Sequence, residues 1–270
     1  MEKISFIGAG SMAEAVIAGI VRKQVFAKEN IYVTNKENKQ RLQELEENYG
    51  IQSSSDRREV VSQADILVIA TKPYDVELAL QETAPYIREG QLIISVVAGV
   101  PTKKIEETVG QEIGVIRSMP NTSATIGYSA TALCKGRYAS EGEVAIARRL
   151  FEAIGEVVLV DEEQMHIVTG LSGSGPAYIY YMVEAMEQAA MEEGLEPSTA
   201  KQLITQTVIG AGKMLAERPE SPAQLREQVT SPNGTTAAGI ATLEAFDVKR
   251  AMVECVKQAT RRSEALGSSE

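Results

Sequence analysis

Short apolar runs alternate with longer segments of helical pattern through about the first 160 residues, and no other feature constrains the fold as strongly. Four of the runs are almost continuously apolar and rich in β-branched side chains: residues 3–8, 31–35, 65–71 and 91–99. Strands of this kind are typical of a parallel sheet covered on both faces. Three intervening segments are long enough for crossover helices: residues 11–23, 36–50 and 73–87. The alternation therefore predicts an α/β domain with a mostly parallel, doubly wound sheet.

The sequence pattern changes near residue 162. Before this point, three further strands are predicted over residues 112–119, 128–135 and 156–161. After it, strand signals fade and apolar residues recur at helical spacing, for example at Ile179, Met182, Val183 and Met186. We therefore expect a first domain over residues 1–162 and an all-α domain over residues 163–270.

Charge and composition exclude several classes of function. The net charge of −10 argues against a nucleic acid or an anionic membrane as partner, because both attract a basic surface. No apolar run approaches the roughly 20 residues of a membrane span, and the first residues lack the pattern of a cleavable signal. Cys134 and Cys255 are far apart in the sequence, so we expect buried free thiols rather than a disulfide or a metal site. A cytoplasmic protein is the expectation.

Residues 8–13, with the sequence GAGSMA, directly follow the first predicted strand and open a helix. In this GxGxxA pattern, Gly8 permits a tight turn, Gly10 lets the backbone approach a pyrophosphate, and Ala13 allows close packing of helix and strand. The free N–H groups at the helix start attract phosphates. The position of the motif predicts a Rossmann-like dinucleotide-binding domain.

The residues after the second predicted strand indicate which nicotinamide cofactor binds. An NAD enzyme usually carries Asp or Glu there for the ribose hydroxyls, whereas this chain carries Asn35, Lys36 and Lys39. None of these residues repels a 2′-phosphate, and a lysine attracts one. We expect NADPH, with NADH as the alternative.

His166 is the only histidine, and no set of Asp, Glu or Cys residues is fixed around it in the sequence. A packing or helix-surface role is therefore favoured over catalysis. No GxSxG, HExxH or paired metal-ligand motif occurs, which excludes the common hydrolases. We expect the chemistry to be hydride transfer by the cofactor, without a metal.

Four segments together resemble the pyrroline-5-carboxylate reductase family over essentially the whole chain. They are ATKP at 70–73, MPNT at 119–122, TGLSGSGPAY at 169–178 and SPNGTTAAGI at 231–240. Two positions depart from the family pattern. Asn233 stands where a glycine is usual, and asparagine tolerates the left-handed conformation better than most residues. Arg57 stands where an asparagine often lies near the adenosine, so it either adds to phosphate binding or is solvated.

The resemblance implies reduction of 1-pyrroline-5-carboxylate to L-proline by NAD(P)H, the last step of proline biosynthesis. It implies cofactor contacts from residues of the first domain: Ile7, Gly8, Gly10, Ser11, Met12, Asn35, Lys36, Arg57, Ala70, Thr71, Lys72, Pro73 and Ala98. Substrate contacts are implied for Asn121, Ser172, Ser231, Asn233, Gly234 and Thr235. Thr236 matches the threonine that hydrogen-bonds the imine and is the expected catalytic residue.

The polar loop before residue 235 also suits a carboxylate on physical grounds. A loop that ends in Gly234 and feeds a helix at Thr235 presents free backbone N–H groups, which attract an anion in an otherwise acidic protein. Capping of that helix is an alternative role for the threonines, and we expect it of Thr235 in addition. A protonated cyclic imine accepts hydride without a strong protein acid, so the absence of a catalytic lysine is not a difficulty.

Two other functions remain as alternatives. The β-hydroxyacid dehydrogenases carry a junction motif that resembles GxxGxGxxxK, and Gly170, Gly173 and Gly175 match its glycines. The lysine position is Ile179, which argues against hydroxyacid oxidation. A non-catalytic NADP-binding regulator is the second alternative, although the loop and Thr236 that it could lose are present.

The predicted helices at about 178–193 and 199–217 are apolar around much of their circumference. Helices of this kind are buried on several sides, and a part of about 108 residues has few helices with which to cover them. The resemblance points the same way, because the related reductases are dimers with the active site near the interface. We expect a homodimer or an assembly of dimers that acts on a small molecule.

Overall fold

The computed structural model describes residues 2–268. Contacts divide the chain into two compact units, Met1–Pro176 with Lys257–Glu270, and Ala177–Val256. The division differs from the change of sequence pattern near residue 162, which marks the end of the strands. As a domain boundary, residue 162 stays a prediction.

Among the described residues, the first unit contains one sheet of eight strands. The strands are β1 (Ile4–Ile7), β2 (Ile31–Thr34), β3 (Gln52–Ser53), β4 (Ile66–Ile69), β5 (Leu92–Ser95), β6 (Gly114–Met119), β7 (Ser129–Lys135) and β8 (Gly155–Leu159). Their order is β3-β2-β1-β4-β5-β6-β7-β8, and only β6 and β7 pair antiparallel. The order reverses between β1 and β4, which is where open α/β sheets bind their ligands.

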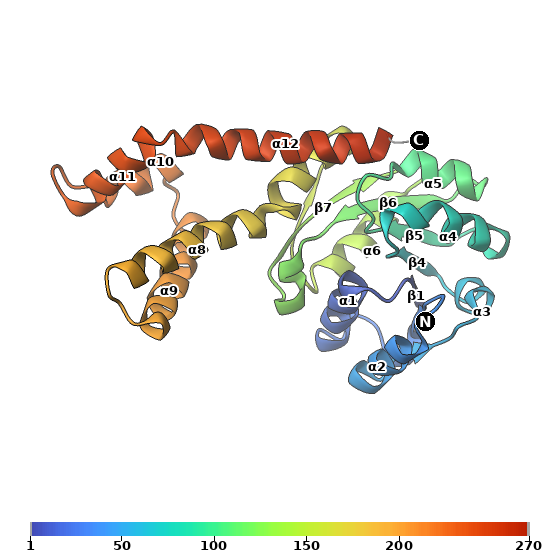
Figure 1. Cartoon of the computed structure of the whole chain (residues 1–270). Coiled ribbons are helices and arrows are strands. Elements are labelled where there is room, and N and C mark those ends of the chain that lie inside the picture. Colours follow the sequence, from blue (N-terminus) through green and yellow to red (C-terminus); the bar gives the residue numbers. More distant parts are fainter. Residues whose placement is uncertain (1, 269–270) are drawn as a thin grey trace. The chain divides into compact units, whose positions relative to one another are not determined.

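Helices lie along both faces of the sheet (Figure 1), and an apolar cluster fills the space on each face. Ile4 and Phe6 of β1 pack with α1 (Ser11–Arg22), α2 (Lys39–Tyr49) and α6 (Glu141–Phe151) on one face. Ile7 packs on the other face with α3 (Arg57–Ser62), α4 (Val76–Thr83) and α5 (Thr102–Val109). Because alternate residues of a strand point to opposite faces, two helical layers require strands that are apolar throughout.

The prediction of a mostly parallel, doubly wound sheet is confirmed. All seven predicted strands and the three crossover helices are present. Strand β3 was not predicted, because its two residues, Gln52 and Ser53, are polar and at least partly exposed. Cys134 is buried as expected, whereas Cys255 is only partly buried.

In the described part of the chain, the regular secondary structure after residue 162 is helical, as predicted. In the first unit lie α7 (Met165–Val168) and a π-helical turn at Thr169–Gly173. The remaining helices are α8 (Gly175–Glu192), α9 (Pro197–Glu217), α10 (Pro222–Gln228), α11 (Thr235–Ala245) and α12 (Val248–Ser268). None of the helices in residues 2–268 combines the length and apolar character that a membrane span requires.

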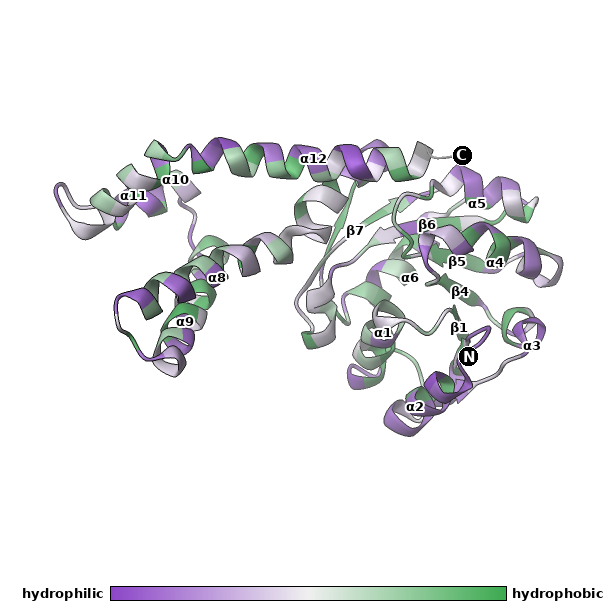
Figure 2. Ribbon diagram, in the orientation of Figure 1, coloured by the Kyte–Doolittle hydropathy of each residue, from purple (hydrophilic) through white to green (hydrophobic). Residues whose placement is uncertain are grey.

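Helices α8 and α9 are rich in apolar residues (Figure 2), and many of their large apolar side chains are exposed. No residue of α8 is buried, although the helix is rich in apolar side chains. Tyr181 is 76% exposed, and Met182, Leu203 and Leu215 are each about half exposed. The hydrophobic effect disfavours so large an apolar surface in water, so the surface indicates a site of association.

An ion pair joins the buried Arg117 of β6 to Glu162, which follows β8 and also binds the start of α5. Arg117 of β6 is 1% exposed, and its Nη1 lies 3.4 Å from Oε1 of Glu162. The Glu162 carboxylate also accepts hydrogen bonds from the backbone N–H of Thr102 at 2.8 Å and from its hydroxyl at 2.5 Å. Removing a group that pairs with a buried charge is costly, because the remaining charge is left without compensation.

The thiol of Cys134 lies beside this pair, since Cys134 of β7 is in register with Arg117 of β6. Burial raises the pKa of the Cys134 thiol to about 12, and the negative charge of Glu162 acts in the same direction. Low polarity disfavours the thiolate more than the neutral thiol. Cys134 is therefore a protonated packing residue at neutral pH.

We expect Glu162→Ala to lower the free energy of unfolding by about 3 kcal/mol, because it leaves Arg117 buried without its partner. Chemical denaturation followed by circular dichroism measures this change. Glu163→Ala is the matched control, since Glu163 is the exposed neighbour, and it should shift the value by less than about 0.5 kcal/mol. Equal losses for the two variants would contradict the role of the ion pair between Glu162 and Arg117.

Candidate functional site

Gly8 forms the tight turn at the end of β1 and approaches the end of β4. Its φ is +111°, a conformation that side chains other than glycine rarely adopt, and a Cβ atom there would lie 2.4 Å from the carbonyl oxygen of Ala70. The N–H of Gly8 donates to the carbonyl of Thr34 at 3.0 Å, and the N–H of Ala70 donates to the carbonyl of Ile7 at 2.9 Å. The turn thus brings the carboxyl ends of β1, β2 and β4 together.

The N-terminus of α1 follows this turn and is open. Gly10 is the residue before the helix, and a Cβ atom on it would meet nothing within 4 Å. No side chain of the described residues caps the helix, so the first N–H groups, at Ser11 and Met12, point to a space that a ligand can fill. Such a helix end favours a phosphate by its N–H groups and its dipole.

Arg41 of α2 holds the glycine-rich loop from the side, which the sequence did not predict. Its Nε donates to the carbonyl of Ala9 at 3.1 Å, and its Nη2 pairs with the carboxylate of Glu14 in α1. The hydrogen bond with Glu14 raises the pKa of Arg41. Tyr49 donates to the other oxygen of Glu14 at 3.0 Å. These bonds fix the loop against α1 and α2.

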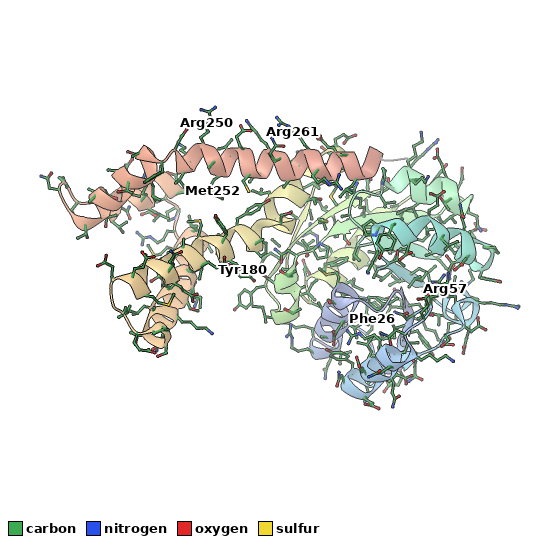
Figure 3. All side chains as sticks on the ribbon, in the orientation of Figure 1. Phe26, Arg57, Tyr180, Arg250, Met252 and Arg261 are labelled. Carbon is green, nitrogen blue, oxygen red and sulfur yellow. The ribbon has the colours of Figure 1, made fainter. Side chains whose placement is uncertain are left out.

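Two cations, Lys36 after β2 and Arg57 at the start of α3, flank one carboxylate. The side-chain oxygen of Asn35 accepts from the N–H groups of Glu37 and Asn38, both at 3.1 Å, which shapes the turn. Nζ of Lys36 lies 3.7 Å from Oε1 of Glu82, and the guanidinium of Arg57 pairs with the other oxygen of Glu82. Arg57 begins α3 (Figure 3). Glu82, from α4, was not predicted as part of this group.

Two hydroxyl groups at this edge of the sheet are buried without a hydrogen-bond partner among the described residues. They belong to Thr34, the last residue of β2, and Thr71, two residues after β4. A buried polar atom without a partner is uncommon and indicates a group that a ligand or a water satisfies. Thr71 was predicted to contact the cofactor.

Pro73 and Ala98 line one cavity of about 460 Å³, together with Tyr74, Gly99 and the end of α12 at Gly267. Lys72 lies directly before Pro73, and its ammonium group is 5.6 Å from the centre of the Tyr74 ring. A hydrogen bond with Tyr74 raises the pKa of Lys72. The structure thus brings the predicted segment 70–73 next to the loop after β5.

Asn121 and Ser172, both predicted to contact substrate, are joined by a hydrogen bond. The side-chain nitrogen of Asn121 donates to the carbonyl of Ser172 at 3.0 Å, and its side-chain oxygen accepts from the N–H of Ser123 at 3.1 Å. Ser172 lies in the π-helical turn, and its hydroxyl donates to the carbonyl of Val168 at 3.2 Å. The amide of Asn121 therefore positions the turn, and π-helical turns are frequent at functional sites.

The loop of the second unit ends at an open helix N-terminus. Asn233 has a φ of +57°, so it adopts the left-handed conformation expected of it, and the N–H of Gly234 donates to the carbonyl of Ser231 at 3.0 Å. Helix α11 begins at Thr235, as predicted. The residue before the helix is Gly234, and no side chain of the described residues caps it, so the prediction that Thr235 caps the helix is wrong. The partly exposed Thr236 lies in the first turn.

His166 has the packing role expected of it. Its Nδ1 lies 3.0 Å from the hydroxyl oxygen of Ser263, which is 4% exposed. The contact joins α7 to α12 within the first unit. The other predicted residues form five groups. They are the Gly8 turn, the segment after β2 with Arg57, the segment 70–73 with Ala98, the Asn121–Ser172 pair, and the loop 231–236. The second unit contains the whole of this loop.

Two family models match the chain. One, described as pyrroline-5-carboxylate reductase dimerisation, matches residues 162–266. The other, described as NADP oxidoreductase coenzyme F420-dependent, matches residues 3–99. The second match covers the Gly8 turn and the residues after β2, β4 and β5, and the first covers the helical part.

Relatives match over nearly the whole length. Pyrroline-5-carboxylate reductase 1 of Bacillus spizizenii is 46% identical over 262 residues, which are 97% of this chain and 88% of the relative. The solved structure of the reductase from Coxiella burnetii has a TM-score of 0.91 at 34% identity and covers 99% of both chains. That of Plasmodium falciparum pyrroline carboxylate reductase with NADP bound has a TM-score of 0.90 at 30% identity, covering 99% of this chain and 98% of that one. The chain belongs to the pyrroline-5-carboxylate reductase family.

Proposed function

We propose that the protein reduces 1-pyrroline-5-carboxylate to L-proline by hydride transfer from NADPH. Family membership supports this activity and disfavours the hydroxyacid alternative. The observation that carries the proposal within the structure is the Gly8 turn, which opens the N-terminus of α1 at the point where the strand order reverses. A site of this kind binds the pyrophosphate of a dinucleotide.

The residues present fit the dinucleotide. Gly8, Gly10, Ser11 and Met12 would hold the pyrophosphate, because the helix start is uncapped and the space above Gly10 is free of protein atoms. Asn35, Lys36 and Arg57 would contact the adenosine ribose and its 2′-phosphate. The segment from Ala70 to Pro73 and the residue Ala98 would line the nicotinamide end of the cofactor. The buried hydroxyl of Thr71, which has no partner among the described residues, would hydrogen-bond the cofactor there. When bound, NADPH supplies the hydride.

The loop from Ser231 to Gly234 would hold the substrate carboxylate. The left-handed conformation of Asn233 turns the chain so that the uncapped N–H groups of α11 are presented at its start. These donors and the helix dipole attract an anion. The acidic protein thus offers the carboxylate a local positive potential, despite its net charge of −10.

Thr236 would orient the ring nitrogen. A hydroxyl group donates a hydrogen bond to a neutral imine nitrogen and accepts one from a protonated iminium, so it fits the substrate in both forms. The hydride adds to the carbon of the C=N bond, and the protonated nitrogen takes up the electron pair of the π bond to become the amine. No alkoxide forms, so the step needs no strong protein acid.

We also infer that the protein is a homodimer or an assembly of dimers. Helix α8 has no buried residue, and the second unit exposes Tyr181, Phe246 and other large apolar side chains. A second copy of the chain would cover them, and a dimerisation model matches this part of the chain. By the resemblance, the active site lies near the interface between two chains. A cytoplasmic location remains a prediction of the sequence.

An absorbance assay of reduced cofactor tests the activity. We expect the purified protein to oxidise NADPH when 1-pyrroline-5-carboxylate is added and to release proline in equal amount, because hydride passes to the imine carbon. The control is NADP with 3-hydroxyacids, for which no reduction of cofactor is expected. Turnover of the hydroxyacids without turnover of the imine would refute the proposed reaction.

Thr236→Ala should lower kcat by about 10- to 1000-fold, the range for one lost hydrogen bond in a transition state, with a smaller effect on cofactor binding. Steady-state kinetics with the cyclic imine measure the change. Thr242→Ala is the matched control, because Thr242 lies in the same helix and its hydroxyl donates within it, to the carbonyl of Ala238 at 3.1 Å. An unchanged kcat in Thr236→Ala would remove Thr236 from the mechanism.

Sedimentation at nanomolar to micromolar concentration should show a species of at least twice the chain mass of 29.2 kDa. We expect Tyr181→Asp to weaken this association, because it places a charge on the exposed apolar face of α8. Tyr74→Asp is a control of similar exposure in the first unit, at 75% against 76% for Tyr181. A fully active monomer would contradict both the dimer and a site completed at its interface.

A further inference from the structure

The carboxylate of Glu82 lies between the two cations that the proposed function assigns to the 2′-phosphate. Glu82 belongs to the last turn of α4, and each of its oxygens faces one cation: Oε1 lies 3.7 Å from Nζ of Lys36, and Oε2 pairs with Nη1 of Arg57. Three elements therefore meet here, the turn after β2, the start of α3 and the end of α4. Nothing in the sequence around Glu82 indicates this contact, because Arg57 and Glu82 are 25 residues apart.

The position of the group relates it to the ribose. In doubly wound folds, the residue at the end of the second strand contacts the 2′ position of the adenosine ribose, and an acidic residue there favours NAD. This chain has Asn35 at that place and Lys36 beside it. Glu82 supplies a carboxylate to the same region from a different element. It is bound to the cations rather than free.

We propose that Glu82 is a specificity-determining residue that lowers the preference for NADPH over NADH. The inference rests on the proposed function. Glu82 occupies Lys36 and Arg57 when no 2′-phosphate is present, and it must leave them when the phosphate binds. NADH has a 2′-hydroxyl in place of the phosphate and makes no such demand.

The charges decide the direction of the effect. Lys36 and Arg57 contribute two positive charges and Glu82 one negative charge, whereas a phosphate monoester carries about −1.5 to −2 at pH 7. A phosphate that replaces the carboxylate gains two charge-assisted contacts but must break those of Glu82. A phosphate that binds beside the carboxylate is repelled by it. Both arrangements weaken NADPH binding relative to a site without the charge of Glu82.

The exposure of the three side chains shows that the carboxylate can be displaced. The side chains of Glu82 and Lys36 are 38% and 53% exposed, so both retain contact with water, while that of Arg57 is 19% exposed. Ion pairs with such exposure are weak, and salt screens them. The effect of Glu82 on NADPH binding is therefore several-fold rather than a thousand-fold.

Glu82 could also have the opposite effect on NADPH binding. A carboxylate that only holds Lys36 and Arg57 in place would prepare the phosphate site, and its loss would weaken NADPH binding. The geometry favours the competing role, because the two oxygens of Glu82 face the two cations that the proposed function assigns to the phosphate. The two roles differ in the sign of the change.

Calorimetric titration of the full-length protein with NADPH and with NADH, without substrate, measures this sign. We expect Glu82→Gln to lower the Kd of NADPH by about 3- to 10-fold and to raise the ratio of the NADH Kd to the NADPH Kd by a similar factor, with a smaller effect at high salt. Glu89→Gln is the control, because it removes the same charge from an exposed residue that lies seven positions later in the chain. It should leave the ratio within about twofold.

A second variant tests whether Glu82 acts through Arg57. In an Arg57→Met background, the change caused by Glu82→Gln should shrink, because the carboxylate then has one cation fewer to compete for. Weaker NADPH binding in Glu82→Gln, or an unchanged ratio, overturns the inference while leaving the reductase activity in place. A wild-type protein that binds neither cofactor and does not reduce the imine overturns the proposed function and the inference together.

Discussion

The site depends on how closely Gly8 approaches the end of β4. The turn at Gly8 passes so near the carbonyl of Ala70 that a side chain would overlap it, and the backbone has a positive φ as well. Because β1 and β4 are neighbours at the point where the strand order reverses, this contact directs the chain from β1 into the N-terminus of α1. Arg41 then holds the carbonyl of Ala9, so the loop is fixed before any ligand arrives. The proposed phosphate site is thus part of the fold rather than an addition to it.

The sequence predicted the sheet well because both faces of it are covered. Continuous apolar runs such as 65–71 and 91–99 have few other structural explanations, and every predicted strand is present. The strand at Gln52–Ser53 has no such signal, since it is short and polar and depends on pairing with β2. The start of α11 at Thr235 was also predicted from a local signal, although its cap was assigned to the wrong residue. Local patterns mark where a helix begins more reliably than which group satisfies its first N–H groups.

The parts of the site that the sequence missed are contacts between distant elements. Arg41 and Glu14 are 27 residues apart, and Arg57 and Glu82 are 25 apart, on helices whose exposed faces look alike in the sequence. A charged residue on such a face is usually solvated, so its partner becomes visible only when the helices are placed on the sheet. The same limit applies to Asn121, whose amide is bonded to the turn at Ser172. The residue was predicted from the resemblance, but its bond to that turn was not.

The thiol of Cys134 and the thioethers of several methionines differ in their exposure, and therefore in how readily they are oxidised. The thiol of Cys134, with a pKa of about 12, is almost never a thiolate at neutral pH, and the thiolate is the form that peroxides attack. Several methionines of the helical unit are about half exposed: Met182, Met186, Met191 and Met214. Oxidation of these residues to sulfoxides would place polar groups on the apolar faces that we propose a second copy covers. Oxidative damage to a free chain would therefore weaken its ability to assemble, while the buried thiol of Cys134 stays protected.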